Sequence, residues 1–245
     1  MATSAGVLYR FASPAAFYPL AGALAPWFLA LAGVLCVAGL YIGFVLAPTD
    51  HQQGEAYRII YLHVPAAWMS MFLYVLMAGY AILFLALNTR LSAMMMAALA
   101  PTGAMFTFIA LWSGALWGRP TWGAYWVWDA RLTSELILLF LYLGFMALQA
   151  AIEDPRRADR AGALLAIVGV VNVPIIYFSV QWWNTLHQGA SVSLTTSPRM
   201  AQIMLAAMLV MAAASWMYAI GASLLRVRTI ILEREGGSDW VRSYV

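Results

Sequence analysis

Charged residues divide the chain into long apolar segments. Uncharged spans lie at 11–49, 59–89, 91–118, 136–152, 161–198 and 200–225. Each span is close to or longer than the roughly 20 residues that an α-helix needs to cross a bilayer. The pattern therefore predicts an all-α integral membrane protein, a single membrane domain over residues 1–245. Its six transmembrane helices are expected near 24–47, 62–87, 93–116, 132–152, 162–182 and 201–224.

The composition supports this class of protein. The chain is 64% hydrophobic and 9% charged, whereas about a quarter of the residues in a soluble domain are charged. The first apolar span is longer than the apolar region of a cleaved signal peptide, so we expect it to remain as a helix.

Local signals mark several helix ends. Pro65 suits the first turn of the second helix, and Asp129 can cap the fourth. The Glu-Asp-Pro run at 153–155 is expected to end that helix. Asn172 and Pro174 interrupt the fifth, where proline removes a backbone donor and predicts a kink.

The distribution of arginine predicts the orientation. Nine arginines fall on the side of the two termini: Arg10, Arg90, Arg156, Arg157, Arg160, Arg226, Arg228, Arg234 and Arg242. Four fall on the other side, and the chain contains no lysine. The positive-inside rule places both termini, including the tail 225–245, in the cytoplasm. The longer connections 48–61, 117–131 and 183–200 then all face outward.

The sequence excludes some chemistry. Cys36 is the only cysteine, so an internal disulfide, a C-x-x-C redox pair and a thiolate metal cluster are all excluded. No G-x-x-x-x-G-K-[ST] loop is present, and ATP hydrolysis by this chain alone is not expected.

Tryptophan is concentrated in one outward-facing stretch, WGRPTWGAYWVW at residues 117–128. This stretch holds four of the 11 tryptophans, and its notable members are Trp117, Gly118, Trp122, Gly123, Tyr125, Trp126 and Trp128. An interfacial aromatic belt is one explanation. A belt does not require glycines between the rings, whereas glycine lets backbone and rings approach a ligand closely. The stretch favours a platform for a flat ligand over a belt.

The three histidines, His51, His63 and His187, all lie in or beside the outward loops. His51 lies in a polar stretch and is expected to be solvated. His63 and His187 flank the aromatic stretch and are a candidate axial pair for a haem iron, because imidazole is a common haem ligand. The alternative is that each is only a hydrogen-bonding residue at the interface.

A porphyrin would also need cations for its two propionates. Arg58, Arg119, Arg131 and Arg199 lie on the outward side and are candidates, although arginines at helix ends also extend toward lipid headgroups. Two other functions compete on the same residues. A proton-coupled transporter would need an ionisable group near mid-membrane, for which Glu135 is the candidate. A quinone-linked cytochrome b would bury its histidines deeper between helices.

The segment WGRPTWGAYWVWDARLTSEL resembles the tryptophan-rich WWD signature of haem-handling proteins in cytochrome c biogenesis. The six-helix pattern, the short chain, the outward histidines and the continuation ELILLFLY are similar to the family of cytochrome c maturation protein C. The resemblance extends roughly from the first helix to the last.

That resemblance implies a haem site on the periplasmic side of a bacterial inner membrane. It implies haem b held by His63 and His187, a cradle of Trp117, Trp122, Trp126, Trp128 and Asp129, and propionate contacts from Arg58 and Arg131. It also implies an assembly factor, not an enzyme, that presents haem for covalent attachment to a periplasmic haem chaperone, maturation protein E. The further implied partners are the ATP-binding-cassette transporter subunits A and B and the small membrane protein D. A haem transporter or cytochrome c synthase component of the WWD group is the alternative, and a small-solute transporter is a more distant one.

Overall fold

The structure, a computed structural model, describes residues 13–187, 189, 192 and 200–244. Within these residues, six helical segments are long and apolar enough to cross a membrane: Pro14–Leu46, Glu55–Leu87, Arg90–Trp122, Ala130–Ala151, Pro155–Trp182 and Gln202–Glu235. No β-strand occurs in the described ranges. The predicted all-α membrane protein with six transmembrane helices is confirmed.

Several of these segments consist of more than one helix. The first segment is α2 (Pro14–Tyr41) followed by a π-helical turn, η1 (Ile42–Leu46). The second is the 3-10 turn η2 (Glu55–Ile59) followed by α3 (Ile60–Leu87). The remaining helices are α4 (Arg90–Trp122), α5 (Ala130–Ala151), α6 (Pro155–Gly169), α7 (Asn172–Trp182), α8 (Gln202–Glu235) and the short η3 (Val241–Ser243).

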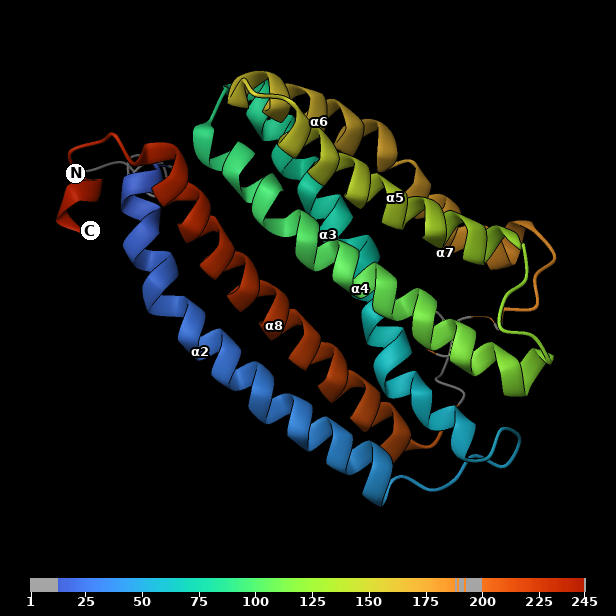
Figure 1. Ribbon diagram of the computed structural model, residues 1–245. Helices are drawn as coiled ribbons and strands as arrows, with labels where there is room; N and C mark the ends of the chain where they lie inside the picture. Colours follow the sequence, from blue (N-terminus) through green and yellow to red (C-terminus); the bar gives the residue numbers. More distant parts are fainter. Residues whose placement is uncertain (1–12, 188, 190–191, 193–199, 245) are drawn as a thin grey trace, which may run out of the picture.

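The helices form an elongated bundle in which α3 and α4 are central (Figure 1). Helix α8 packs between this central pair and α2, which lies at one edge. On the opposite side, α5 packs against α4, and α6 and α7 pack against α5. Helix α2 begins and α8 ends at the same end of the bundle, and the connections 47–54 and 123–129 lie at the other end.

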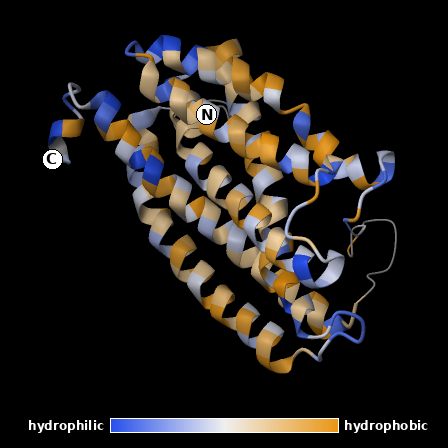
Figure 2. Ribbon diagram, turned by 45° about the vertical axis from the view of Figure 1, so that its right-hand side comes forward, coloured by the Kyte–Doolittle hydropathy of each residue, from blue (hydrophilic) through white to orange (hydrophobic). Residues whose placement is uncertain are grey.

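Hydrophobic residues cover the length of the bundle, and hydrophilic residues gather at its two ends (Figure 2). On α2, the side chains of Trp27, Val34 and Val37 are 66–76% exposed. Apolar side chains on the outside of a bundle are stable in a lipid environment, where every helical backbone group is already hydrogen-bonded internally.

Several helices are longer than predicted, including α6, which begins at Pro155 and not near residue 162. Helix α2 begins at Pro14 and not near residue 24, because Ser13 caps it through the amide of Ala16. Helix α4 continues to Trp122 instead of ending near 116, and α8 continues to Glu235 instead of 224. Charged residues mark the edge of an apolar span, but a helix can continue past that edge into water. The predicted tail 225–245 is therefore largely helical.

The predicted position of Pro65 in the first turn of the second helix is wrong. Helix α3 begins at Ile60, directly after the 3-10 turn η2, so Pro65 lies inside the helix. The prediction failed because the polar sequence before residue 60 already adopts a helical turn.

The predicted interruption of the fifth span is confirmed. Helix α6 ends at Gly169 and α7 begins at Asn172. Pro174 has no N–H to donate to the carbonyl of Val170, which instead accepts from the amide of Val173 at 3.0 Å. The Asn172 side chain donates to the carbonyl of Ser134 at 2.8 Å and so joins the break to α5.

A buried aromatic contact fixes the helices that carry the site. The ring of Tyr142 lies over Gly103, where an added Cβ would stand 2.1 Å from its Cζ. Its hydroxyl donates to the carbonyl of Ser70 at 2.8 Å. Tyr142 thus connects α5 to α4 and α3 in the centre of the bundle.

Ion pairs join the helices at the end of the bundle where α8 ends. Arg234 near the end of α8 pairs with Asp159 of α6 at 2.7 Å, and Arg90 pairs with Glu235 at 2.7 Å. The carboxylates of Asp159 and Glu235 are buried, so each is satisfied by a partner from another helix.

Candidate functional site

A cavity of about 330 Å³ opens at the end of the bundle that carries the connections 47–54 and 123–129. Side chains from α3, α4, α5, α7 and α8 line it, together with residues that follow α7. Among them are His63, Ala67, Trp68, Met71, Gly114, Trp117, Gly118, Trp122, Arg131, Glu135, Tyr177 and His187. The volume falls within the range of roughly 300–1,000 Å³ that is typical of ligand sites.

His63 lies in the second turn of α3 and is 9% exposed. Its Nδ1 lies 3.1 Å from Oγ of Ser113 on α4. The ring also makes an edge-on contact with Trp117, with 5.6 Å between the ring centroids. The imidazole is therefore held by α4 from two directions.

The second histidine of the predicted pair lies beside the first. The ring centroids of His63 and His187 are 6.2 Å apart, with 35° between the ring planes. The ring centroids of Trp122 and His187 are 6.0 Å apart. The two imidazoles, 124 positions apart in the sequence, thus share one aromatic-walled cavity.

A hydroxyl connects the backbone of His187 to the tryptophan-rich stretch. The amide of His187 donates to Oγ1 of Thr185 at 3.0 Å, and the Thr185 hydroxyl donates to one carboxylate oxygen of Asp129. The other carboxylate oxygen accepts from the amide of Leu132 at 2.8 Å. The predicted N-cap role of Asp129 is confirmed, and the same carboxylate ties the start of α5 to the segment that carries His187.

Trp117 and Trp122 line the cavity from the last turns of α4, not from a loop as predicted. Residues 117, 118, 121 and 122 share one face of that helix, since positions four apart are neighbours on a helix. Trp117 also donates from Nε1 to Oε1 of Gln53 at 2.7 Å, which joins α4 to the connection 47–54.

Three other aromatic residues of the stretch lie outside the lining of the cavity. Trp126 and Trp128 pack edge to face with 5.3 Å between their centroids, and Arg119 lies 5.8 Å from the centroid of Tyr125. The side chains of Tyr125 and Trp128 are 57% and 77% exposed. Contacts of these residues with a ligand stay a prediction.

The two glycines of the stretch differ in role. Gly118 lines the cavity, and an added Cβ there would stand 3.0 Å from the Trp122 ring and from the carbonyl oxygen of Ala124. Gly123 has φ +80° and ends α4, with its amide donating to the carbonyl of Arg119 at 3.1 Å. The left-handed conformation at Gly123 therefore explains that glycine as a helix terminator.

Arg131 and Glu135 supply the charged side chains of the cavity. Arg131 donates to the carbonyl of Ile176 on α7 at 2.7 Å. Glu135 is buried and accepts a hydrogen bond from the Ser70 hydroxyl at 2.7 Å. Arg131 is thus the predicted propionate partner that lies in the cavity.

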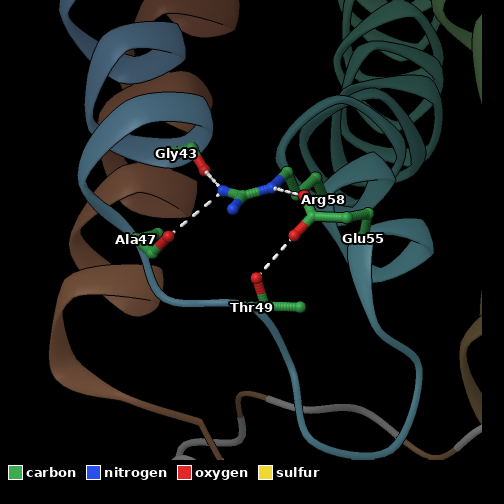
Figure 3. A network of polar contacts seen from close by, with 5 residues as sticks. All are labelled: Gly43, Ala47, Thr49, Glu55 and Arg58. Carbon is green, nitrogen blue, oxygen red and sulfur yellow. Dashed lines mark hydrogen bonds and ion pairs between the residues drawn. The ribbon is translucent and has the colours of Figure 1, made fainter.

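Arg58 lies elsewhere, between the end of the first span and η2 (Figure 3). Its guanidinium donates to the carbonyls of Gly43 and Ala47 and pairs with Glu55, which also accepts from Thr49. A cation at these carbonyls complements the negative end of the helix. The structure gives Arg58 a helix-capping role outside the cavity lining, and its contact with a propionate stays a prediction. Arg199, another candidate, lies outside the described residues.

Sequence reasoning missed four residues that support the site: Gln53, Ser113, Gly114 and Thr185. A signal for two of them was present. Ser113 and Gly114 form a pair of small residues in an apolar helix, about one turn before Trp117. Small residues at such positions let a bulky side chain of a neighbouring helix approach the backbone.

The donor set fits a haem iron. The imidazole rings of His63 and His187, with 6.2 Å between their centroids, lie in one cavity, and imidazole is a common ligand of haem iron. In the described part of the chain, no group of three or more His, Cys, Asp or Glu side chains could hold a metal ion. Two imidazoles alone are too few for a free ion, but a porphyrin supplies the remaining nitrogens.

The fold and the site define a multi-pass membrane protein with a histidine-containing, aromatic-walled cavity at one end of its helical bundle. The chain belongs to the heme exporter protein C family, whose family pattern matches residues 7–242. It is 46% identical over 244 residues to "Heme exporter protein C" of Escherichia coli (strain K12), covering 97% of this chain and 96% of that protein. It is 47% identical over 227 residues to the protein of the same name in Bradyrhizobium diazoefficiens, covering 93% and 86%. A "cytochrome c biosynthesis ccmC-like mitochondrial protein" of Marchantia polymorpha is 48% identical over 159 residues, which are 65% of this chain and 67% of that protein.

Proposed function

We propose that this protein binds haem b in the cavity at the end of its bundle and presents it during cytochrome c biogenesis. The haem site would face the periplasm from a bacterial inner membrane. The acceptor would be a periplasmic haem chaperone of the maturation protein E type, to which haem becomes covalently attached. The chain would act as an assembly factor and not as an enzyme.

The observation that carries the proposal is the pair of neighbouring histidines in the cavity. His63 and His187 bring their rings within 6.2 Å of each other inside a cavity walled by Trp117 and Trp122. The names of the relatives, which speak of heme export and cytochrome c biosynthesis, support the same assignment.

Each group in the cavity has a role in this proposal. His63 and His187 would hold the iron, and the indole rings of Trp117 and Trp122 would offer flat surfaces for the ligand. Arg131 would donate hydrogen bonds to a propionate, because this residue lines the cavity at the start of α5. When bound, haem supplies the iron and the vinyl edge at which covalent attachment takes place. The protein would contribute to attachment only by holding that edge in one orientation.

The partners follow from the same proposal. Haem attachment requires the chaperone to reach the exposed rim, where Tyr125 and Trp128 extend from the connection 123–129. The chain has no nucleotide-binding loop, so ATP-driven release would depend on transporter subunits A and B with the small membrane protein D.

An absorption spectrum of the purified protein tests this function. After haem-replete expression, we expect a Soret band and the low-spin, six-coordinate spectrum of a b-type haem. Replacing His63 or His187 with alanine should change that spectrum, and replacing both should abolish it. An unchanged spectrum in the double variant would contradict the axial assignment.

A small-solute transporter is the competing function, because Glu135 is buried near the cavity. Its carboxylate accepts a hydrogen bond from Ser70 and lies in the same cavity as the histidines. Solute flux that requires Glu135 and survives replacement of Trp122 and Asp129 would favour the transporter. The absence of a Soret band after haem-replete expression would point the same way.

A further inference from the structure

We infer that Ser113 is a positioning residue that selects the ring nitrogen with which His63 binds iron. Its hydroxyl holds the proton of His63 on Nδ1 and leaves the lone pair of Nε2 for the metal. The part of this inference that concerns iron rests on the proposed function. The part that concerns the proton on the ring does not.

The direction of the hydrogen bonds sets the tautomer. The Ser113 hydroxyl carries one proton, which it donates within α4 to the carbonyl of Ile109 at 2.5 Å and, more weakly, to that of Ala110 at 3.3 Å. Toward Nδ1 of His63, 3.1 Å away, the same oxygen can then only accept. A neutral imidazole has one N–H, so Nδ1 is the donor and Nε2 carries the lone pair.

Burial of both side chains supports this tautomer of His63. Ser113 is 1% exposed and His63 is 9% exposed, so water does not compete for Nδ1. With the opposite tautomer, the Ser113 hydroxyl would have to turn away from the carbonyl of Ile109 to donate to Nδ1. It would then exchange a bond of 2.5 Å for one of 3.1 Å.

The shape of α4 beside Ser113 agrees with this orientation. A Cβ added at Gly114 would stand 3.0 Å from Cε1 of His63, 3.5 Å from Nδ1 and 3.9 Å from Nε2. The ring therefore lies against the helix with Cε1 nearest, and Nδ1 is closer to that position than Nε2. Ser113 and Gly114 together form a seat for the imidazole, one residue by hydrogen bonding and the other by leaving room.

Such a bond has consequences for a metal ligand. A partner on the second nitrogen of a ligating histidine fixes the ring orientation and raises the basicity of the ligand, and its loss typically lowers metal affinity by about 10- to 100-fold. Ser113 would thus tune the iron without touching it.

The proton can be located without haem. The chain has three histidines, so ¹⁵N-histidine labelling of the ligand-free protein gives few ring signals, and His63→Ala identifies those of His63. We expect Nδ1 of His63 to be protonated and Nε2 to be unprotonated. In Ser113→Ala this preference should weaken, and the carbonyl of Ala110, which also accepts a hydrogen bond from the His63 side chain, should account for what remains. Protonation on Nε2 in the unaltered protein, or unchanged signals in Ser113→Ala, would overturn the inference even if haem binds as proposed.

Haemin titration into the detergent-purified protein tests the consequence for iron. Ser113→Ala should weaken binding by about 10- to 100-fold and raise the reduction potential, because a less basic ligand stabilises the ferric state less. Ser113→Thr keeps the hydroxyl and should restore both properties. The matched control is Thr107→Val, which removes another buried hydroxyl of α4 that bonds only within its helix, to the carbonyl of Gly103 at 2.8 Å. An equal loss in Thr107→Val, or none in Ser113→Ala, would contradict the role of Ser113.

Discussion

Two hydroxyl groups hold the two histidines, and each both donates and accepts a hydrogen bond. The Ser113 hydroxyl meets the side chain of His63. The Thr185 hydroxyl meets the backbone of His187 and also the carboxylate of Asp129. A hydroxyl suits this task because it can accept from one group while donating to another. The histidines themselves are recognisable in the sequence, whereas the residues that orient them are not.

Replacing Thr185 with valine should weaken haem binding by roughly tenfold or more, since hydrogen bonds to charged groups contribute about 1.5–3 kcal/mol each. The variant removes the donor to Asp129 and the acceptor for the His187 amide. Haemin titration monitored at the Soret band measures the effect. Thr229→Val is the control, because that exposed hydroxyl lies near the far end of α8. Equal affinities of the Thr185 and Thr229 variants would contradict the link to His187.

Replacing Gly114 with alanine should disturb the low-spin spectrum, because the new Cβ would stand 3.0 Å from Cε1 of His63. The ring must shift by a few tenths of an ångström, and its alignment with His187 changes. Gly79→Ala on α3 is the matched control, since an added Cβ there has nothing within 4 Å. Alanine generally favours a helix over glycine by up to about 1 kcal/mol, so a spectral change in the Gly114 variant alone would separate geometry from stability. Identical spectra in both variants would count against the seat on α4.

At the scale of elements, two short polar connections build the site by fixing helix ends. The 123–129 connection begins at Gly123, which ends α4, and finishes at Asp129, which caps α5. The 47–54 connection is held by Gln53, which accepts from Trp117. Because α4 supplies more lining residues than any other helix and α5 supplies Arg131 and Glu135, the length of α4 and the start of α5 decide which side chains enter the cavity.

The cap of α5 provides a prediction at this scale. Asp129→Ala should lower the free energy of unfolding by about 0.5–2 kcal/mol through loss of the cap and should also weaken haem binding, since Asp129 holds Thr185. Asp154→Ala removes the corresponding cap of α6 at the opposite end of the bundle. There Asp154 accepts a hydrogen bond from the amide of Arg157 at 2.7 Å. Thermal unfolding and haemin titration of both variants measure the two effects. We expect the two variants to be destabilised to a similar extent and only Asp129→Ala to bind haem more weakly. Weaker haem binding in both variants would mean that Asp129 contributes only to stability.

The dimensions of the whole molecule place the cavity near the membrane surface. A span of 33 residues, such as Arg90–Trp122, is about 50 Å long at 1.5 Å per residue. The hydrocarbon core of a bilayer is about 30 Å thick. The ends of the longest helices therefore extend beyond the hydrocarbon, and the last turns of α4, with Trp117 and Trp122, reach the interface where indole rings are favoured.

The orientation of the molecule can be tested by cysteine labelling. In a Cys36→Ala background, Tyr125→Cys should react with a membrane-impermeant maleimide added to intact spheroplasts. Asp239→Cys, which follows the end of α8, should react only after the membrane is permeabilised. Both side chains are exposed, so access to the reagent and not burial decides the result. The reverse pattern would place the termini in the periplasm and contradict the prediction from arginine.

The sequence alone determined the class of protein and much of its framework. The six apolar spans of the sequence correspond to six membrane-spanning segments in the structure. A bilayer requires a spanning helix to be long and apolar, and both properties can be read from consecutive residues. The cap at Asp129 and the break before Pro174 were predictable for a similar reason, since both depend on residues within one turn. The resemblance carried by WGRPTWGAYWVWDARLTSEL predicted the family to which the chain belongs.

Only the tertiary structure decided which of the predicted residues meet. The rotation of α4 directs Trp117 and Trp122 into the cavity, whereas Tyr125, Trp126 and Trp128 follow the end of that helix and lie outside its lining. His63 and Ser113, 50 positions apart, come together because α3 and α4 pack as an antiparallel pair. Contacts of this kind depend on the rotation and crossing of whole helices, which no local pattern specifies, and this is the physical reason why the seat of the histidine was visible only in the folded chain.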